Sequence, residues 1–197
     1  MAHYFDKEPA SALREQEVTV HAFGQSYRFL SASGLFSKDH LDTASSLLLE
    51  RCDLAGAKRV LDLGCGWGAV AVLLKLAHPR LSVVASDVNT RAVLYTKKNA
   101  KRHGVEVEVV RSDLFASLSD ETFDLILTNP PYVAGRETCF AFIQESFAHL
   151  APGGSLQLVA RHNKGGKVLS EYMKTVFGNM EAIAKQGGFR IYKSLRG

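Results

Sequence analysis

The stretch KRVLDLGCGWGAV, Lys58–Val70, changes from an apolar run into a cluster of glycines. Its first part, Lys58–Gly64, is rich in branched apolar residues, which is typical of a buried strand. Gly64, Gly66 and Gly68 then allow a tight turn and a close approach to a ligand, because glycine has no Cβ. The stretch therefore predicts a buried strand that turns sharply into a helix.

Further strand candidates follow along the chain, and helical patterns separate them. The candidates are Leu81–Asp87, Val105–Asp113, Phe123–Asn129, Gly154–Ala160 and two short strands around Gly187-Gly188. The helical patterns are marked by one-face spacing, first of Phe140, Ile143, Phe147 and Leu150 before a stop at APGG, and then of Val168, Tyr172 and Val176. Repeated strand–helix units predict an α/β fold, with a parallel sheet covered by helices on both faces.

The N-terminal part has a different pattern. Glu17–Leu30 reads as a small hairpin that turns near Gly24-Gln25. Ser37 is predicted to cap the helix that follows, with Leu41, Ala44 and Leu48 facing inward. The chain shows no internal repeat or linker, so we expect one domain over residues 1–197, with a hairpin extension in residues 1–36 and the core in 37–197.

Composition limits the class of protein. Hydrophobic residues make up 46% of the chain and charged residues 22%, which is ordinary for a soluble globular protein. No apolar run approaches the roughly 20 residues that span a bilayer, and the first residues lack a signal-peptide pattern. Cys52, Cys65 and Cys139 are far apart, which predicts neither a disulfide framework nor a metal site and fits a reducing cytoplasm. The net charge of +4 permits a nucleic-acid partner without requiring one.

Ligands of such sheets bind beyond the carboxyl ends of the strands. The glycine cluster fits a loosened dinucleotide fingerprint, another nucleotide-like cofactor, or a turn without a ligand. Asp87 ends the second strand, where its carboxylate can accept hydrogen bonds from both hydroxyls of a ribose. The alternative is that Asp87 caps the next helix, with Asn89 as the rival cap. Asp113 and Leu114 end the third strand and suit an adenine amino group and ring face, although a simple turn also fits.

The fourth strand ends abruptly in Asn129-Pro130-Pro131-Tyr132. An amino group on a planar π system is a poor nucleophile, because its lone pair is delocalised. Two acceptors at its hydrogens, the side-chain oxygen of Asn129 and the carbonyl of Pro130, would aim that nitrogen, and the prolines would hold them in place. Tyr132 offers a flat face for stacking. The alternative is an ordinary strand-terminating turn.

The motifs VLDLGCGWG, ASD, RSDLF and TNPPY, in this order, resemble those of class I S-adenosylmethionine-dependent methyltransferases. The flanking residues 31–50 and 164–196 are similar to the "small" methyltransferase domain family, whose best-known member class, ribosomal RNA small subunit methyltransferase C, modifies guanine N2. The resemblance implies a Rossmann-like, doubly wound, seven-stranded sheet with an N-terminal hairpin. It also implies S-adenosylmethionine as the cofactor and no metal.

The resemblance also implies site residues. The methionine end of the cofactor would be lined by Asp62, Gly64, Gly66 and the backbone of Cys65, its ribose would be held by Asp87, and its adenine would be held by Asp113 and Leu114. The target amine would be held beside the cofactor by Asn129, Pro130, Pro131 and Tyr132. Phe36 would close the pocket. The bacterial rRNA enzymes of this type carry two related domains. This chain matches the catalytic one, so their RNA target does not carry over.

Basic segments offer candidate RNA contacts. The segment after the fifth strand lies at the edge where ligands bind, and its candidates are Arg161, Lys164 and Lys167. A second group lies on one side of the predicted helix Arg91–His103 and consists of Lys97, Lys98, Lys101 and Arg102. That group is either a phosphate-binding surface or a solvated face near a helix C-terminus.

The leading hypothesis is a cytoplasmic N-methyltransferase that acts on an exocyclic amine of an RNA base, most readily guanine N2 in small-subunit ribosomal RNA. Its partner would be ribosomal RNA or the small ribosomal subunit. Methyl transfer would be a direct displacement, with Cys65 and Cys139 serving packing rather than catalysis. The alternatives are a glutamine methyltransferase of release factors, a non-catalytic RNA-binding module and, more distantly, a nicotinamide dehydrogenase. The oligomeric state is not predicted.

Overall fold

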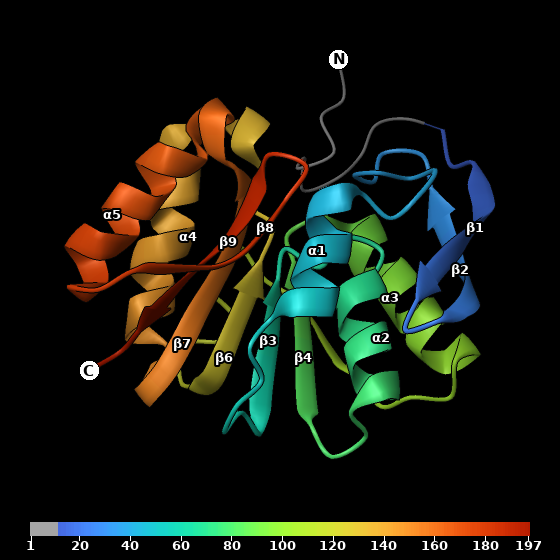
Figure 1. Ribbon diagram of the computed structural model, residues 1–197. Coiled ribbons are helices and arrows are strands. Elements are labelled where there is room, and N and C mark those ends of the chain that lie inside the picture. The colour runs from blue at the N-terminus through green and yellow to red at the C-terminus, as the bar shows by residue number, and fades with distance from the viewer. Residues whose placement is uncertain (1–11) are drawn as a thin grey trace.

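The structure is a computed structural model that describes residues 12–197. Its centre is a seven-stranded sheet in the order β5-β4-β3-β6-β7-β9-β8 (Figure 1). The strands are β3 Arg59–Leu63, β4 Ser82–Asp87, β5 Glu108–Arg111, β6 Phe123–Thr128, β7 Leu150–Arg161, β8 Glu181–Gln186 and β9 Phe189–Leu195. The predicted Rossmann-like α/β fold with an N-terminal hairpin is confirmed.

The sheet is mixed rather than wholly parallel, which corrects the sequence prediction. Strand β9 runs antiparallel to both β7 and β8. The chain reverses between β8 and β9 at Gly187 and Gly188, which have φ of 56° and 82°. Glycine reaches this left-handed region without the steric cost that a Cβ imposes. A tight hairpin therefore replaces the crossover that a parallel strand would need.

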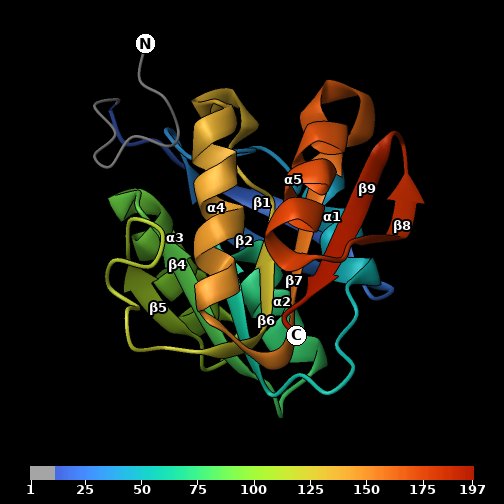
Figure 2. The ribbon, with the colours of Figure 1, turned by 90° about the vertical axis from the view of Figure 1, so that its left-hand side faces the viewer.

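Helices cover both faces of the sheet. One face carries α1 Thr43–Arg51, α2 Ala69–Ala77 and α3 Thr90–Arg102, and the other carries α4 Arg136–Ala148 and α5 Lys167–Phe177, which lie side by side (Figure 2). Each face has its own apolar core, and successive strand residues alternate between them: Val60 belongs to one and Leu61 to the other. Burial on both sides explains why these strands read as continuous apolar runs.

Several predicted boundaries differ from the structure, and the strand predicted over Val105–Asp113 is shorter, as β5 Glu108–Arg111. The helix of Phe140 ends at Ala148, and β7 already begins at Leu150, so the APGG segment lies within a strand rather than ending a helix. Ser37 does not cap α1. It has a positive φ of 46°, and its hydroxyl donates to the carbonyl of His40 at 2.7 Å. The cap is Asp42, the polar side chain that stands directly before the helix.

The hairpin consists of β1 Glu15–Ala22 and β2 Gln25–Ala32, and it turns at Phe23-Gly24, one residue earlier than predicted. Buried Asn99 of α3 ties it to the core. Its amide accepts from the N–H of Leu30 and donates to the carbonyl of Leu30, both at 2.8 Å, and it also donates to the carbonyl of Trp67 at 2.8 Å. The hairpin is thereby fixed to the glycine turn. The boundary at residue 36 stays a prediction, and residues 1–11 lie outside the described residues.

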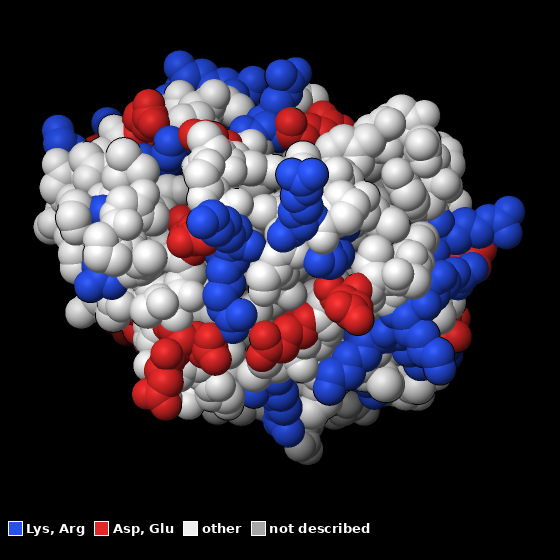
Figure 3. Space-filling model, turned by 90° about the horizontal axis from the view of Figure 1, so that it is seen from below, with Lys and Arg blue, Asp and Glu red and all other residues white. Residues whose placement is uncertain are grey.

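The hairpin also accounts for half of the basic group on α3. Lys98 forms an ion pair with Glu15 at 2.6 Å, and Arg102 pairs with Glu17. Helix α3 runs back toward the end of the sheet where the parallel strands begin. Seen from that end, Lys and Arg side chains gather on one side with Asp and Glu side chains beside them (Figure 3). Within residues 12–197, no helix is long and apolar enough to cross a bilayer.

Candidate active site

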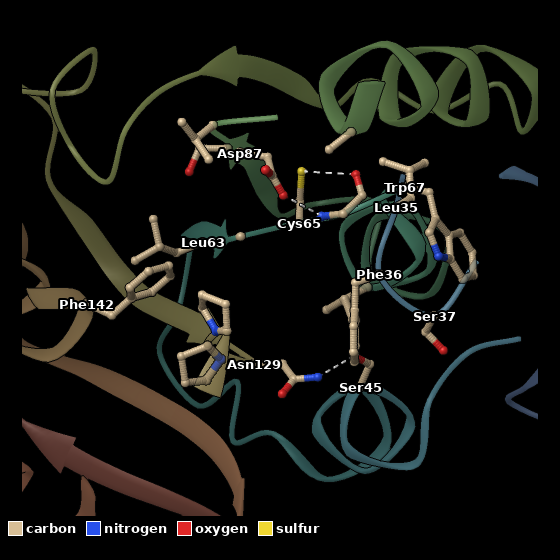
Figure 4. Close-up of a pocket in the computed structure, with 18 of the residues that line it drawn as sticks. Leu35, Phe36, Ser37, Ser45, Leu63, Cys65, Trp67, Asp87, Asn129 and Phe142 are labelled. Carbon is tan, nitrogen blue, oxygen red and sulfur yellow. Dashed lines mark hydrogen bonds between the residues drawn. The ribbon is translucent and has the colours of Figure 1, made fainter. Parts of the chain in front are cut away.

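A cavity of about 330 Å³ opens at the carboxyl ends of β3, β4 and β6. Most of the predicted site residues line it: Phe36, Gly64, Cys65, Gly66, Asp87, Asp113, Leu114, Asn129, Pro130 and Pro131. These residues come from segments that are distant in sequence, and Figure 4 shows several of them around one hollow. The sheet topology therefore brings the predicted cofactor and amine residues to one place.

The glycine turn forms one wall of the cavity. Gly64 and Gly66 have φ of 81° and 57°, which favour glycine. The N–H groups of Gly64 and Cys65 both donate to the carbonyl of Ser86, at 2.9 and 3.0 Å. A Cβ on Gly64 would point to the ring of Phe142, 3.5 Å away across the wall. The turn thus presents bare backbone to a ligand.

Asp87 stands at the end of β4 with both carboxylate oxygens engaged. Its Oδ2 accepts from the N–H of Gly66 and its Oδ1 from the N–H of Asn89, each at 2.9 Å. Burial raises the pKa of Asp87 to about 6. Asn89 caps α3 by accepting from the N–H of Arg91 at 2.8 Å. The rival cap is therefore the real one. A carboxylate has about four acceptor positions, so Asp87 keeps acceptor capacity for a ligand beside these backbone donors.

Asp62 lies behind the glycine turn and not among the residues that line the cavity. Its Oδ2 accepts from the N–H of Ala71 at 3.1 Å, which satisfies a donor in the first turn of α2. Burial, reinforced by the charge of Asp87, raises the pKa of Asp62 to about 7. Asp62 therefore supports the turn from inside the protein, and its predicted contact with the cofactor stays a prediction.

The cysteines near the site are buried thiols. Burial raises the pKa of Cys65 well above its usual range, and its sulfur lies 3.5 Å from the hydroxyl oxygen of Thr96. Burial likewise raises the pKa of Cys139 to about 11, where it packs in α4. A thiol with a raised pKa is a weak nucleophile, since the thiolate is the reactive form. The two cysteines therefore serve packing and the shape of the turn.

Asn129 and Pro130 follow β6 and face the cavity. The side-chain NH2 of Asn129 donates to Oδ1 of Asp42 at 3.2 Å and to Oγ of Ser45 at 3.1 Å, and its oxygen is left as an acceptor (Figure 4). The carbonyl of Pro130 accepts from the N–H of Tyr132 at 2.8 Å, which leaves one lone pair. Pro131, with φ of −74° and ψ of 79°, forms the inverse γ-turn that holds this carbonyl.

The two aromatic rings near the prolines have different surroundings. Phe36 is 40% exposed and lines the cavity together with Asn129 (Figure 4). Tyr132 is 41% exposed, lies in a short 3-10 helix over Tyr132–Ala134, and does not line the cavity. Its ring packs on Gly165, where a Cβ would come within 1.7 Å of the Tyr132 hydroxyl oxygen. The stacking role of Tyr132 stays a prediction.

The predicted RNA contacts lie outside the cavity, at the same end of the sheet. Arg161 lies over the ring of Phe189, with its guanidinium carbon 5.9 Å from the centroid. Lys164 is exposed, and Lys167 approaches Glu171 at 3.9 Å in an exposed pair. The three residues belong to different elements: Arg161 ends β7, Lys164 lies in the segment His162–Gly166, and Lys167 begins α5. The sequence therefore did not predict how their side chains are arranged.

A further basic group was missed from the sequence and includes Lys185 and Arg190. These two are direct cross-strand partners in the β8–β9 hairpin. Desolvation lowers the pKa of His162, and the charges of Arg190, Lys167 and Lys185 lower it further, so these cations lie on the same side of the protein as His162. We call Lys167, Lys185 and Arg190 the basic rim.

Other cavity residues were also missed, among them Leu35, Leu41, Asp42, Ser45, Trp67 and Phe142. Asp42 has the sequence signal of a helix cap, because it is a polar residue directly before an apolar helix. The sequence prediction gave the cap role to Ser37 instead. Nothing in the local sequence indicates that Asp42 reaches Asn129, which is 87 positions away.

The cavity fits S-adenosylmethionine. It combines a carboxylate at the end of β4 for a ribose, the adjacent Asp113 and Leu114 for an adenine, and bare backbone at Gly64 and Gly66. Leu114 holds a positive φ of 50°, a conformation that is uncommon for this residue and is found at functional sites. Among residues 12–197, no group of three or more His, Cys, Asp or Glu side chains is arranged to hold a metal ion.

Comparison with known proteins agrees with this geometry. The chain is 32% identical to the uncharacterized protein YbxB of Bacillus subtilis, over 98% of this chain and 97% of that protein. It is 34% identical to ribosomal RNA small subunit methyltransferase C of Serratia proteamaculans, over 82% of this chain and 46% of that protein. The chain thus spans about half the length of the rRNA methyltransferases that it matches.

A solved structure of a methyltransferase is also similar to this chain. The 16S rRNA N2 methyltransferase of T. thermophilus, in complex with AdoMet and guanosine, superposes with a TM-score of 0.80 at 26% identity, over 96% of this chain and 52% of that one. The cofactor predicted from the sequence agrees with the one in that complex. Residues 26–193 match the model of the methyltransferase small domain. The chain therefore belongs to the methyltransferase small domain family.

Proposed function

We propose that this protein is an S-adenosylmethionine-dependent N-methyltransferase that acts on the exocyclic amine of an RNA base, guanine N2 in small-subunit ribosomal RNA. The observation that carries the proposal is the pair of acceptors at the end of β6. The oxygen of Asn129 and the carbonyl of Pro130 lie in the same cavity as Asp87. The rRNA methyltransferase relatives and the guanosine-bound neighbour support an RNA base as the substrate.

The acceptors make the amine reactive by orienting it. When bound, the cofactor supplies a methyl group activated by its sulfonium. Asn129 and Pro130 each accept one hydrogen bond from the target NH2, which turns the nitrogen lone pair away from them and toward the methyl group. As the N–C bond forms, the bond from the methyl carbon to sulfur would break, and the nitrogen would release one proton to water. The proline-fixed turn holds both acceptors before the substrate arrives, so little ordering is left to the reaction itself. The chain thus contributes alignment and the exclusion of water.

Phe36 and Pro131 are the proposed walls for the base. Both line the cavity, and Phe36 presents a large apolar ring with 40% of its surface exposed. A base that stacks on Phe36 would bring its exocyclic amine to Asn129. A continuous duplex does not expose its bases to such a pocket, which favours a loop or an unstacked nucleotide. Tyr132 holds the proline segment against Gly165 from outside the cavity.

The basic rim supports a nucleic acid rather than a protein substrate. Lys185 and Arg190 stand directly opposite each other on a hairpin, where like charges repel. An anionic partner relieves that repulsion, and RNA phosphates supply one at regular spacing. Lys167 of the rim directly follows the loop of Gly165, on which Tyr132 of the proline segment packs. Arg161 and Lys164 extend the basic surface.

We expect replacement of Lys164 and Lys167 by alanine to weaken RNA binding and to flatten its salt dependence, by up to about two units in the slope of log K against log salt. Cofactor binding should stay intact, because neither side chain lines the cavity. The measurement is filter binding of ribosomal RNA fragments over a salt series.

The matched control replaces Lys97 and Lys101 by alanine. This change removes the same charge from the opposite end of the sheet. The control should bind RNA like the unchanged protein. An equal loss in both variants would show that only net charge matters and would remove the assigned contact surface.

Nucleoside mass spectrometry tests the function itself. The protein is incubated with labelled S-adenosylmethionine and with ribosomal RNA, small subunits or a release-factor peptide. New N2-methylguanosine in RNA or subunits supports the proposal. Methylation of a glutamine alone would assign the site to a protein amide, and a different methylated nucleoside would keep the RNA substrate but reject guanine N2.

A further inference from the structure

One carboxylate oxygen joins the cap of α1 to the proposed methyl-transfer site. Oδ1 of Asp42 accepts from the N–H groups of Ala44 at 3.0 Å and Ser45 at 3.1 Å, which makes it the helix cap. The same oxygen accepts from the side-chain NH2 of Asn129 at 3.2 Å. Oγ of Ser45 lies 3.1 Å from that NH2 as a second partner. The NH2 of Asn129 is therefore held by two residues of one helix start.

The orientation of the Asn129 amide decides whether it works as an acceptor. A terminal amide has an oxygen and an NH2 of nearly the same shape, and rotation about its last bond exchanges them. The flipped amide would present two donors to the target amine, which also donates, and the substrate would be repelled. A carboxylate only accepts. Asp42 therefore selects the orientation in which the NH2 faces α1 and the oxygen is free for the substrate.

The start of α1 is a rigid base for this selection. Asp42 is held by the two backbone N–H groups that it caps, and α1 is anchored by buried Leu47 and Leu48. The segment that leads into α1 also carries Phe36 and Leu41, which line the same cavity. One continuous stretch of chain thus supplies a wall of the cavity and also holds the Asn129 amide.

We propose that Asp42 and Ser45 are positioning residues that lock the amide of Asn129 with its oxygen toward the substrate. The inference rests on the proposed function, in which Asn129 accepts a hydrogen of the target amine. It adds that the helix cap is part of the methyl-transfer machinery and acts only through Asn129.

Asp42→Ser separates capping from locking. Serine caps a helix about as well as aspartate, but its shorter side chain does not reach Asn129. Loss of one hydrogen bond to a charged group should lower kcat by about tenfold to a hundredfold. KM and the cofactor-induced rise in melting temperature should change little. Asp42→Asn should retain most of kcat, because its oxygen stays on the cap N–H groups and still accepts from Asn129.

Thr43→Ala is the matched control, since Thr43 is the exposed neighbour in the same turn. It should keep full kcat. Ser45→Ala is the second test, because it removes the hydroxyl at Asn129 and leaves the cap, made through the backbone of Ser45, in place. It should lower kcat several-fold even if Asp42→Ser proves unstable.

A double-mutant cycle with Asn129→Ala decides whether Asp42 acts through Asn129. If it does, Asp42→Ser should lower kcat in the unchanged protein and have no further effect once Asn129 is alanine. An equal fall in both backgrounds, or full kcat in Asp42→Ser and Ser45→Ala, would overturn the lock and leave the proposed function standing. Full activity of Asn129→Ala itself would instead overturn the proposed function.

Discussion

Asn129→Ala should lower the rate of methyl transfer about 10²–10³-fold, the effect of deleting one preorganised group that stabilises a transition state. The substitution removes one of the two acceptors and leaves the target nitrogen unaimed. It also leaves the carbonyl of Pro130 in place, so activity should fall rather than vanish. Single-turnover transfer of labelled methyl at saturating cofactor measures the effect on the chemical step.

The cofactor provides the internal control for this variant. Because Asp87 and the glycine turn hold the cofactor in this proposal, its affinity should change far less than the rate. Turnover near that of the unchanged protein would mean that the amide is not an acceptor for the substrate. A loss of cofactor affinity as large as the loss of rate would move Asn129 from the substrate to the cofactor side of the site.

Asp87→Ala should largely abolish the rise in melting temperature that S-adenosylmethionine and its demethylated product produce. A ligand at 100 times its Kd stabilises the folded state by about 2.7 kcal/mol. Loss of the acceptor for two ribose hydroxyls should weaken binding about a hundredfold or more, since hydrogen bonds to a charged group contribute about 1.5–3 kcal/mol each. About 0.4 kcal/mol would then remain at the same concentration. A rise with NADH and none with S-adenosylmethionine would mean that the cofactor class is wrong.

The same carboxylate should make binding depend on pH. Burial raises the pKa of Asp87 to about 6, so much of the group is protonated below that pH. Ribose hydroxyls donate to the ionised form, and affinity should therefore rise with pH and be up to about tenfold weaker at pH 5 than at pH 7. The raised pKa has the opposite effect on the free protein, whose stability should fall as pH rises from about 4 to about 6. Asp87→Asn should remove both the change in affinity centred near pH 6 and the fall in stability between about pH 4 and about pH 6.

Local patterns in the sequence were sufficient for most of the fold. The apolar runs, the glycine turn at Gly64 and the strand break at Pro130 predicted the strands, the helices and the edge of the sheet where the cavity lies. This works because the chain itself sets the period of a strand and the φ of glycine and proline. The direction of β9 did not follow, because a run of apolar residues reads the same whether its neighbour is parallel or antiparallel.

The sequence also indicated which residue types form the site. The hydrogen-bond and packing partners of those residues, however, are determined by the tertiary structure. The sequence predicted that the side-chain oxygen of Asn129 accepts a hydrogen bond from the target amine, because an amide oxygen is an acceptor and the two prolines that follow hold it in place. Only the folded chain brings Asp42 to its NH2, turns Tyr132 onto Gly165 and pairs Lys185 with Arg190 across a hairpin. Contacts between residues so far apart depend on how the helices and strands pack against one another, and no short stretch of sequence carries that information.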